Sequence, residues 1–369
     1  MGIGEAILGP TLPSLASQTS ASIAQISFLF TALGSGHMIG AFAGGRLYDF
    51  LRGHTVTFVM LLVIAAVFFF IPVIPILWVL TMVIFLLGLA QGAMDVGVNT
   101  QLIWVWDAAS APFLNALQFF FGLGAFISPV IIAQSRQLTG SVKSAYWLAA
   151  LVMLPVALWM VAMRSPRSHV QSTEEAPASD FNPRLVFLLA VFLMLYIGVL
   201  VGFSGWIYTI VTTEGLIPLA QADYLVSAFW GALTIGRLIM VPISSRVKPL
   251  KLLYFDILGC TASVAAFILF RESTTAIWGC TIALGLFIAS VFPSAIAHAN
   301  KYMHMNGKVT GMTFLGGNTG TMLIPLILGQ IFAARGGTAV LVAILVDLFL
   351  TLAMLVVLSV YSRKLVSRN

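Results

Sequence analysis

The hydrophobic pattern of the chain consists of about twelve long apolar stretches separated by short polar breaks. Each stretch approaches the roughly 20 residues that a helix needs to cross the hydrocarbon core of a membrane. The pattern predicts an all-α integral membrane protein. The expected spans are 1–16, 25–48, 55–74, 77–104, 111–134, 144–163, 185–211, 222–243, 250–270, 276–299, 309–333 and 338–361.

The longest polar stretch lies between the sixth and seventh spans. It contains Ser-Thr-Glu-Glu-Ala-Pro-Ala-Ser-Asp, a composition typical of a linker. We therefore predict an N-terminal six-helix bundle at 1–164, a cytoplasmic linker at 165–183 and a C-terminal six-helix bundle at 184–369.

The two predicted bundles repeat each other at an offset of 196 residues. Ile39 and Gly40 correspond to Ile235 and Gly236, since 235 − 39 = 196. Further pairs at the same offset are Gly9 with Gly205, Gly124 with Gly320 and Pro129 with Pro325. Such parallel repeats are typical of transporters, with a solute site at the repeat interface near the membrane midplane. The partner of Leu185 would precede Met1, so we expect a truncated first helix and a natural start upstream.

Composition and charge agree with a membrane protein. The chain is 60% hydrophobic and 8% charged, with a mean hydropathy of +1.04, which excludes a soluble domain. Most basic residues lie in short loops on one side, which predicts that both termini are cytoplasmic. We expect a monomer in a bacterial inner membrane, with a small solute and the lipid bilayer as partners. The net charge of +6 forms no basic stripe with aromatic residues, so nucleic acid is excluded as a partner.

The sequence carries no motif of an enzyme or of a bound cofactor. Cys260 and Cys280 lie in apolar spans without a CxxC pair or a Cys/His cluster. There is no HExxH, no facing Ser/His/Asp set and no phosphate-binding loop. We therefore expect no catalysis and no cofactor, apart from a proton or sodium as coupling ion.

Asp95 is the most informative residue of the fourth span. A carboxylate near the bilayer centre costs roughly 2.5 to 3.5 kcal/mol even on lenient scales. At helical spacing, Gln91, Asp95 and Asn99 point the same way. Asp95 is interpreted either as part of a transport site or as a hydrogen-bonding group between helices.

The end of the second span carries a recognisable motif. Small residues at Gly36, Gly40 and Gly44 lead into Gly45-Arg-Leu-Tyr-Asp49-Phe-Leu-Arg52-Gly53. This run resembles the loop 2–3 signature of the major facilitator superfamily, G-x-L-A-D-R-x-G-R. The resemblance implies the twelve-helix fold of that superfamily. It also implies that Gly45, Asp49 and Arg52 belong to a conformational latch that holds the outward-facing state.

A second resemblance covers the fourth and fifth spans. Asp95-Val-Gly-Val-Asn99 is similar to the acid-xxx-Asn element of the fucose and glucose/galactose permease branch. Leu114-Asn-Ala-Leu-Gln-Phe-Phe-Phe-Gly-Leu-Gly124 is similar to its L-N-x-x-Q-x-F-x-x-x-G element. The related animal sodium-dependent glucose transporters have a fourth span of this kind. The resemblance implies a symporter in which Asp95 and an acid of the first span, Glu5, serve sugar binding and ion coupling. Leu200 stands where the branch tends to have a further acid.

Polar residues near the midplane suit a sugar-sized solute. Amide side chains each offer a donor and an acceptor for hydroxyl groups, and aromatic rings can form apolar walls. The expected substrate-binding residues are Asn99, Asn115, Gln118, Phe121, Trp206 and Asn318. Helix packing is the alternative for the aromatic residues. His37 is expected either to relay protons with Asp95 and Glu5 or to be structural.

We therefore predict a secondary active transporter that couples a proton or sodium to symport of a monosaccharide or similar polyhydroxy solute by alternating access. Two alternatives stay open: an exporter of drugs or apolar metabolites, and a solute sensor that does not transport. Asp256 and Asp347, in the ninth and twelfth spans, are expected to pair with basic residues.

Overall fold

The computed structural model describes residues 1–163, 165–166, 182–244, 246–303 and 307–366. The chain divides into two compact units, Met1–Thr173 and Glu174–Asn369. Most of the predicted linker, 165–183, lies outside the described residues. Within the described residues, eleven helical segments are long and apolar enough to cross a membrane. The first helix has 17 residues and comes in addition to these eleven.

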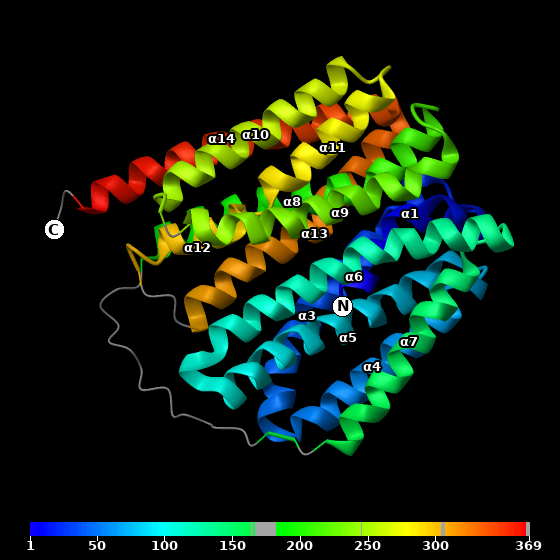
Figure 1. The fold of residues 1–369 in the computed structure, drawn as a ribbon, viewed down its shortest axis with the longest axis horizontal. Helices are drawn as coiled ribbons and strands as arrows, with labels where there is room; N and C mark the ends of the chain where they lie inside the picture. The colour runs from blue at the N-terminus through cyan, green and yellow to red at the C-terminus, as the bar shows by residue number, and fades with distance from the viewer. Residues whose placement is uncertain (164, 167–181, 245, 304–306, 367–369) are drawn as a thin grey trace. The chain divides into compact units, whose positions relative to one another are not determined.

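The first unit contains six long helices and a few short turns (Figure 1). Its elements are α1 (Gly2–Gln18), α2 (Ile23–Ile26), α3 (Phe28–Phe50), α4 (Gly53–Phe70), η1 (Ile71–Val73), α5 (Leu77–Trp106), η2 (Asp107–Ala109), α6 (Ser110–Thr139) and α7 (Lys143–Ala162). The second unit repeats this plan. Its elements are α8 (Pro183–Thr213), α9 (Leu219–Ser244), α10 (Pro249–Leu269), α11 (Thr274–Ile288), α12 (Val291–Ala299), α13 (Gly307–Arg335) and α14 (Gly337–Val366).

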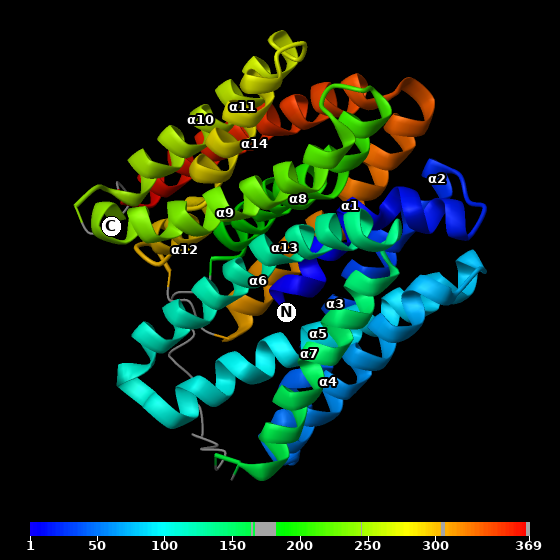
Figure 2. The same cartoon turned by 45° about the vertical axis from the view of Figure 1, so that its right-hand side comes forward.

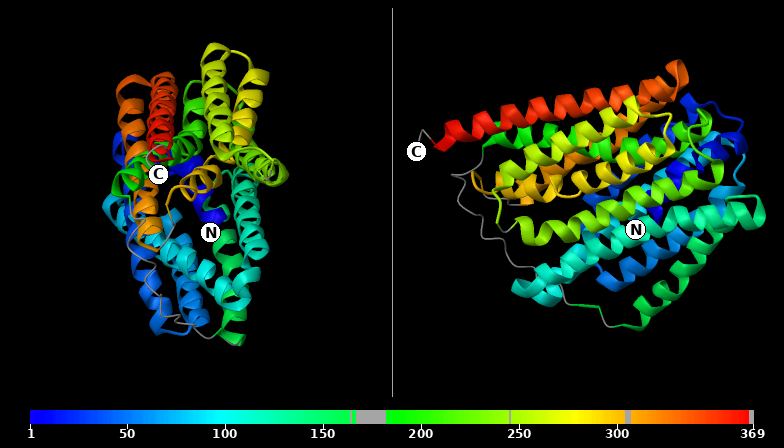
Figure 3. Two further views of the ribbon diagram at one scale, coloured as in Figure 1. Left: turned by 90° about the vertical axis from the view of Figure 1, so that its left-hand side faces the viewer. Right: turned by 45° about the horizontal axis from the view of Figure 1, so that its top comes forward.

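The repeat is visible in which helices pack together. In the first unit α1 packs on α6, α3 on α5, and α4 on α7 (Figure 2). In the second unit α8 packs on α13, α9 on α11, and α10 on α14 (Figure 3). Counted as spans, these pairs are 1–5, 2–4 and 3–6, followed by 7–11, 8–10 and 9–12. The predicted two six-helix repeats are confirmed.

Glycine allows the paired helices to approach closely. A Cβ on Gly40 of α3 would lie 2.0 Å from the Leu89 carbonyl oxygen of α5. In the reverse direction, a Cβ on Gly92 of α5 would lie 2.0 Å from the His37 carbonyl oxygen of α3. The backbones of α3 and α5 are therefore in direct contact, as in other small-residue seams of membrane helices. Gly236, the repeat partner of Gly40, lies against Leu286 and Ala289 in the second unit.

The tenth span differs from the single helix expected at 276–299. It is divided into α11, which ends at Ile288, and α12, which begins at Val291. Pro293 lacks a backbone N–H, so the Ala289 carbonyl cannot receive an α-helical bond from position 293. The break therefore has a local cause in the sequence.

The glycine seam gives a first testable prediction. Gly92→Ala places a methyl group on the α3 backbone, and forced overpacking of this kind costs about 1–3 kcal/mol. We expect a lower melting temperature of the purified protein, measured by tryptophan fluorescence. Gly279→Ala is the control, because a Cβ there meets no atom of the described chain within 4 Å. Equal melting temperatures for the two variants would contradict the claim that α3 and α5 pack in direct backbone contact at Gly92.

Candidate functional site

The polar face of α5 is arranged as its spacing predicts. Gln91 is buried, whereas Asp95 and Asn99 are half-buried on the same face. The Asn99 side-chain amide donates to the Asp95 backbone carbonyl at 2.8 Å and to Asp95 Oδ1 at 3.3 Å. Asn99 therefore holds the carboxylate of Asp95 by a hydrogen bond within the helix and leaves Asp95 Oδ2 for other partners.

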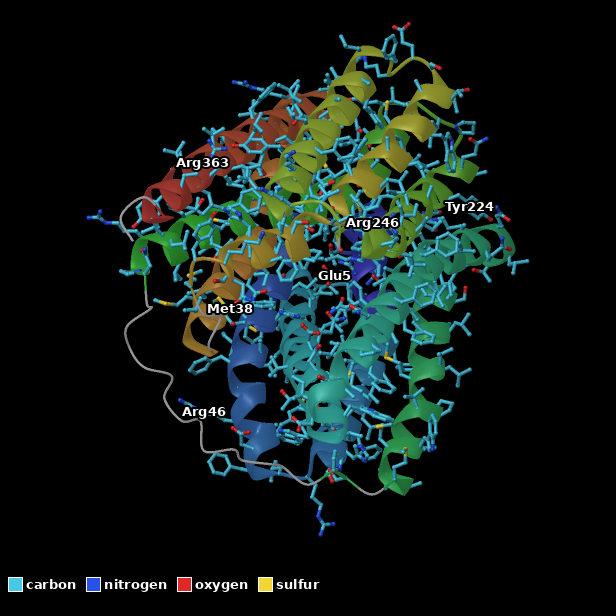
Figure 4. All side chains as sticks on the ribbon, turned by 60° about the vertical axis from the view of Figure 1, so that its left-hand side comes forward. Glu5, Met38, Arg46, Tyr224, Arg246 and Arg363 are labelled. Atoms are coloured by element: carbon cyan, nitrogen blue, oxygen red, sulfur yellow. The ribbon has the colours of Figure 1, made fainter. Side chains whose placement is uncertain are left out.

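Helices α1 and α3 bring two more titratable groups to this face. Glu5 projects from α1 (Figure 4), and His37 lies on α3 next to the seam with Gly92. The charges of Glu5, His37 and Asp95 act on one another electrostatically. Three predicted ion-coupling residues from three helices are thus close enough to interact electrostatically within the first unit. Among the described residues, however, no three such side chains are placed so that they could hold a metal ion.

Gln91 lies on the polar face that the spacing predicted, but it was not among the predicted binding residues. Its Nε2 lies so close to α1 that a Cβ on Gly4 would be 2.0 Å away. The same Nε2 is buried and has no hydrogen-bond partner among the described residues. A buried amide without a partner costs free energy unless a ligand or water supplies an acceptor. Spacing indicated the face but not which amide would lack a partner.

The other predicted binding amides lie on α6 and α13. Asn115 and Gln118 are exposed on α6, one turn apart, and Phe121 follows on the same helix as a half-buried residue. Helix α6 packs on α1, where a Cβ on Gly2 would lie 1.9 Å from the Phe121 carbonyl oxygen. In the second unit, Asn318 is half-buried on α13.

Trp206 takes part in helix packing, which was the alternative to solute binding in the sequence analysis. Its side chain is fully buried in the second unit. The indole Nε1 donates to the Pro325 carbonyl oxygen of α13 at 2.9 Å, and the ring stacks on Phe332 with centroids 5.7 Å apart. Trp206 thereby stabilises the packing of α8 against α13.

The predicted latch residues lie at the end of α3. Asp49 and Arg52 are exposed, and a Cβ on Gly45 would meet no described atom within 4 Å. Arg46 extends from the same end, beyond Met38, with its guanidinium 5.0 Å from the centre of the Phe42 ring (Figure 4). These exposed groups are available to a partner in another conformation.

A buried hydrogen-bond cluster fixes the backbone beside this latch. The Tyr48 and Thr57 hydroxyls are 2.9 Å apart, and Gln101 Nε2 donates to Thr57 Oγ1 at 3.1 Å. A Cβ on Gly97 would lie 1.9 Å from the Tyr48 ring. The cluster joins α3, α4 and α5, so contacts within the first unit fix the backbone next to the predicted latch residues.

The fold and the sequence together define the class of protein. A sequence model described as Major Facilitator Superfamily matches residues 1–325. The chain belongs to the major facilitator superfamily, and it is an integral membrane transport protein rather than an enzyme.

Two groups of curated relatives are similar along most of the chain. Sodium-dependent glucose transporter 1 of Xenopus laevis is 28% identical over 357 residues, covering 88% of this chain and 72% of that protein. Major facilitator superfamily domain-containing protein 4A of Mus musculus is 28% identical over 438 residues, covering 92% and 86%. These relatives are animal proteins. The bacterial membrane and the cytoplasmic termini stay predictions.

Solved structures show the same fold at low sequence identity. A mutant of the nucleoside transporter NupG has a TM-score of 0.77 at 14% identity, covering 99% of this chain and 97% of that one. A bacterial homolog to the human lysosomal transporter Spinster also has a TM-score of 0.77, at 11% identity, covering 97% and 94%.

Removal of the Thr57 hydroxyl tests the hydrogen-bond cluster of Tyr48, Thr57 and Gln101. Thr57→Val keeps the shape of the side chain but leaves Tyr48 and Gln101 without their shared partner. Loss of a buried partner costs about 1–3 kcal/mol. We expect a lower melting temperature than for Thr100→Val, whose lost hydroxyl bonds only the Val96 carbonyl of its own helix. If Thr57→Val and Thr100→Val have the same melting temperature, the cluster does not stabilise the first unit.

Proposed function

We propose that the protein is a cation-coupled symporter of a monosaccharide or similar polyhydroxy solute that works by alternating access. The observation that carries this proposal is the electrostatic interaction of Glu5, His37 and Asp95, which come from three helices of the first unit. Beside them lies the buried Gln91 amide, which has no partner among the described residues. Ion coupling and hydroxyl binding can both be served by this one group of side chains.

Coupling follows from the cost of charge in a membrane. An uncompensated carboxylate at membrane depth is unfavourable, so Asp95 and Glu5 favour a bound cation. In this proposal the cation neutralises Asp95, and His37 adjusts the charge balance or passes a proton to Glu5. Solute and cation then favour each other's binding, because such coupling is reciprocal.

Solute binding is assigned to the amides. Gln91 Nε2 donates to a hydroxyl oxygen, and Asn99, Asn115 and Gln118 supply further donors and acceptors. Asn318, on α13 of the second unit, stays a predicted binding residue. The similarity to the sodium-dependent glucose transporter 1 of Xenopus laevis supports a sugar as solute and sodium as one candidate ion. A proton is the other candidate. Asp49 and Arg52 are proposed to act in the conformational latch.

Asp95→Asn tests the coupling role. The variant keeps the size and hydrogen-bonding oxygen of the side chain but removes its charge. We expect sugar uptake into proteoliposomes to lose accumulation against a gradient, while exchange of labelled for unlabelled sugar continues. The matched control is Asp107→Asn, the same change at an exposed acid just after α5. Uphill accumulation by Asp95→Asn would remove Asp95 from the coupling mechanism.

Gln91→Ala tests the solute contact. Removing one hydrogen bond worth about 1.4 kcal/mol raises the KM for sugar by about tenfold. Gln101→Ala serves as control, because this amide of α5 bonds Thr57 instead. We expect Gln101→Ala to lower the melting temperature and leave the KM unchanged. An unchanged KM in Gln91→Ala would show that this amide does not contact the solute.

A further inference from the structure

The break in the tenth span is held by a side chain from another helix. The Tyr196 hydroxyl of α8 donates to the Ile288 carbonyl oxygen at 3.3 Å, and the backbone of Phe292 hydrogen-bonds the same hydroxyl. In an uninterrupted helix, the Phe292 N–H would bond the Ile288 carbonyl directly. Tyr196 is thus inserted into the hydrogen-bond ladder of the span, one of the recognised causes of a sharp helix break.

Asp256 of α10 faces this break, and its hydrogen-bond partner there is the Ser290 hydroxyl, whereas the sequence predicted a basic partner. Its side chain is fully buried. One carboxylate oxygen, Oδ2, accepts a hydrogen bond from the Ser290 hydroxyl in the broken turn. The other oxygen, Oδ1, is buried and has no hydrogen-bond partner among the described residues. A buried carboxylate with one hydroxyl donor has too few hydrogen-bond donors, because it can accept about four hydrogen bonds.

Other charged and titratable groups surround the break. The charge of Asp256 acts on Tyr196 of α8 and on Cys260 of its own helix. Arg237 of α9 acts on the Tyr196 hydroxyl. The strongest interaction of the Asp256 carboxylate with another side chain is the Ser290 hydrogen bond. The Ser290 hydroxyl is neutral and does not balance the negative charge of Asp256.

The donor atoms around Asp256 suit a small monovalent cation. They are the carboxylate oxygens, the Ser290 hydroxyl and, in the same turn, the Ala289 carbonyl, which Pro293 leaves without an α-helical N–H donor. All of these are hard oxygen ligands. The part of the chain that the structure describes contains no group of three or more His, Cys, Asp or Glu side chains for a metal ion. A proton on Oδ2 would remove the charge and be donated to Ser290 Oγ, but Oδ1 would still have no hydrogen-bond donor among the described residues. Sodium would satisfy several oxygens at once.

We propose that Asp256, Ser290 and the broken turn at 288–290 form a sodium-binding site in the second unit. Unwound carbonyls and half-helix ends coordinate sodium in other transporters with interrupted helices. This site is distinct from the group around Asp95, which belongs to the first unit. Sodium binding stands on the local geometry, whereas a part in driving solute uptake rests on the proposed function.

The experiment measures sodium binding without transport. The purified full-length protein is heated in detergent with sodium chloride or with choline chloride at equal ionic strength, and unfolding is followed by tryptophan fluorescence. A ligand that binds the folded form raises the melting temperature, by about 2 °C at a sodium concentration near 100 mM. We expect this rise in the unmodified protein and in Asp95→Asn. In Asp256→Asn we expect no rise. In Ser290→Ala we expect the sodium concentration that gives half of the rise to be about tenfold higher.

Asp347→Asn is the matched control. Asp347 is also a buried acid of the second unit, and neither of its carboxylate oxygens has a hydrogen-bond partner among the described residues. We expect the sodium effect to be unchanged in this variant. If Asp256→Asn does not fold, Ser290→Ala carries the test alone.

Three results would overturn the proposal. They are a full sodium effect in both Asp256→Asn and Ser290→Ala, no sodium effect in the unmodified protein, and a melting temperature that responds to pH through Asp256 but not to sodium. The last would assign a proton to the site. A sodium effect that depends on Asp256, in a protein that accumulates no sugar, would support this site while rejecting the proposed function.

Discussion

Within the hydrocarbon core of a membrane, a polar group has only the protein to bond with, because no water is present to take its place. This constraint accounts for the helical architecture, since a helix satisfies its own backbone. It also makes every exception informative. Asp95 is held by Asn99 one turn away on α5. The interrupted ladder of the tenth span is completed by the Tyr196 hydroxyl. Gln91 Nε2 and Asp256 Oδ1, two of the polar atoms without a partner among the described residues, lie where we propose a ligand.

Close helix contact is the second condition on which the candidate site depends. The seam of α3 and α5 brings the backbone of His37 against Gly92, between Gln91 and Asp95 in the sequence. Helix α1 approaches the same face through Gly4, next to Glu5. A methyl group at Gly92 would meet the α3 backbone and separate α3 from α5, whereas a methyl group at Gly4 would displace the Gln91 amide. Glycine packing therefore sets the distances over which Glu5, His37 and Asp95 interact.

Much of this arrangement could be predicted from the sequence. Apolar length gave the spans, and the offset of 196 residues gave the repeat, which the matching helix pairs confirm. The spacing of Gln91, Asp95 and Asn99 gave the polar face of α5. The break in the tenth span was missed, although Pro293 was a readable signal. Its second cause, Tyr196, comes from a helix about 90 residues earlier, and such a contact leaves no local pattern. Trp206 was equally undecided, because an indole that binds solute and one that bonds Pro325 look alike in a sequence.

The central claim is that a cation gradient drives the movement of a polyhydroxy solute through this protein. The most direct measurement is uptake of labelled glucose into proteoliposomes with an inward sodium gradient, an inward proton gradient, or neither. The account predicts accumulation above the external concentration with at least one of the gradients, and its loss when that gradient is collapsed. Uptake that only equilibrates glucose at the same rate under all three conditions would contradict it.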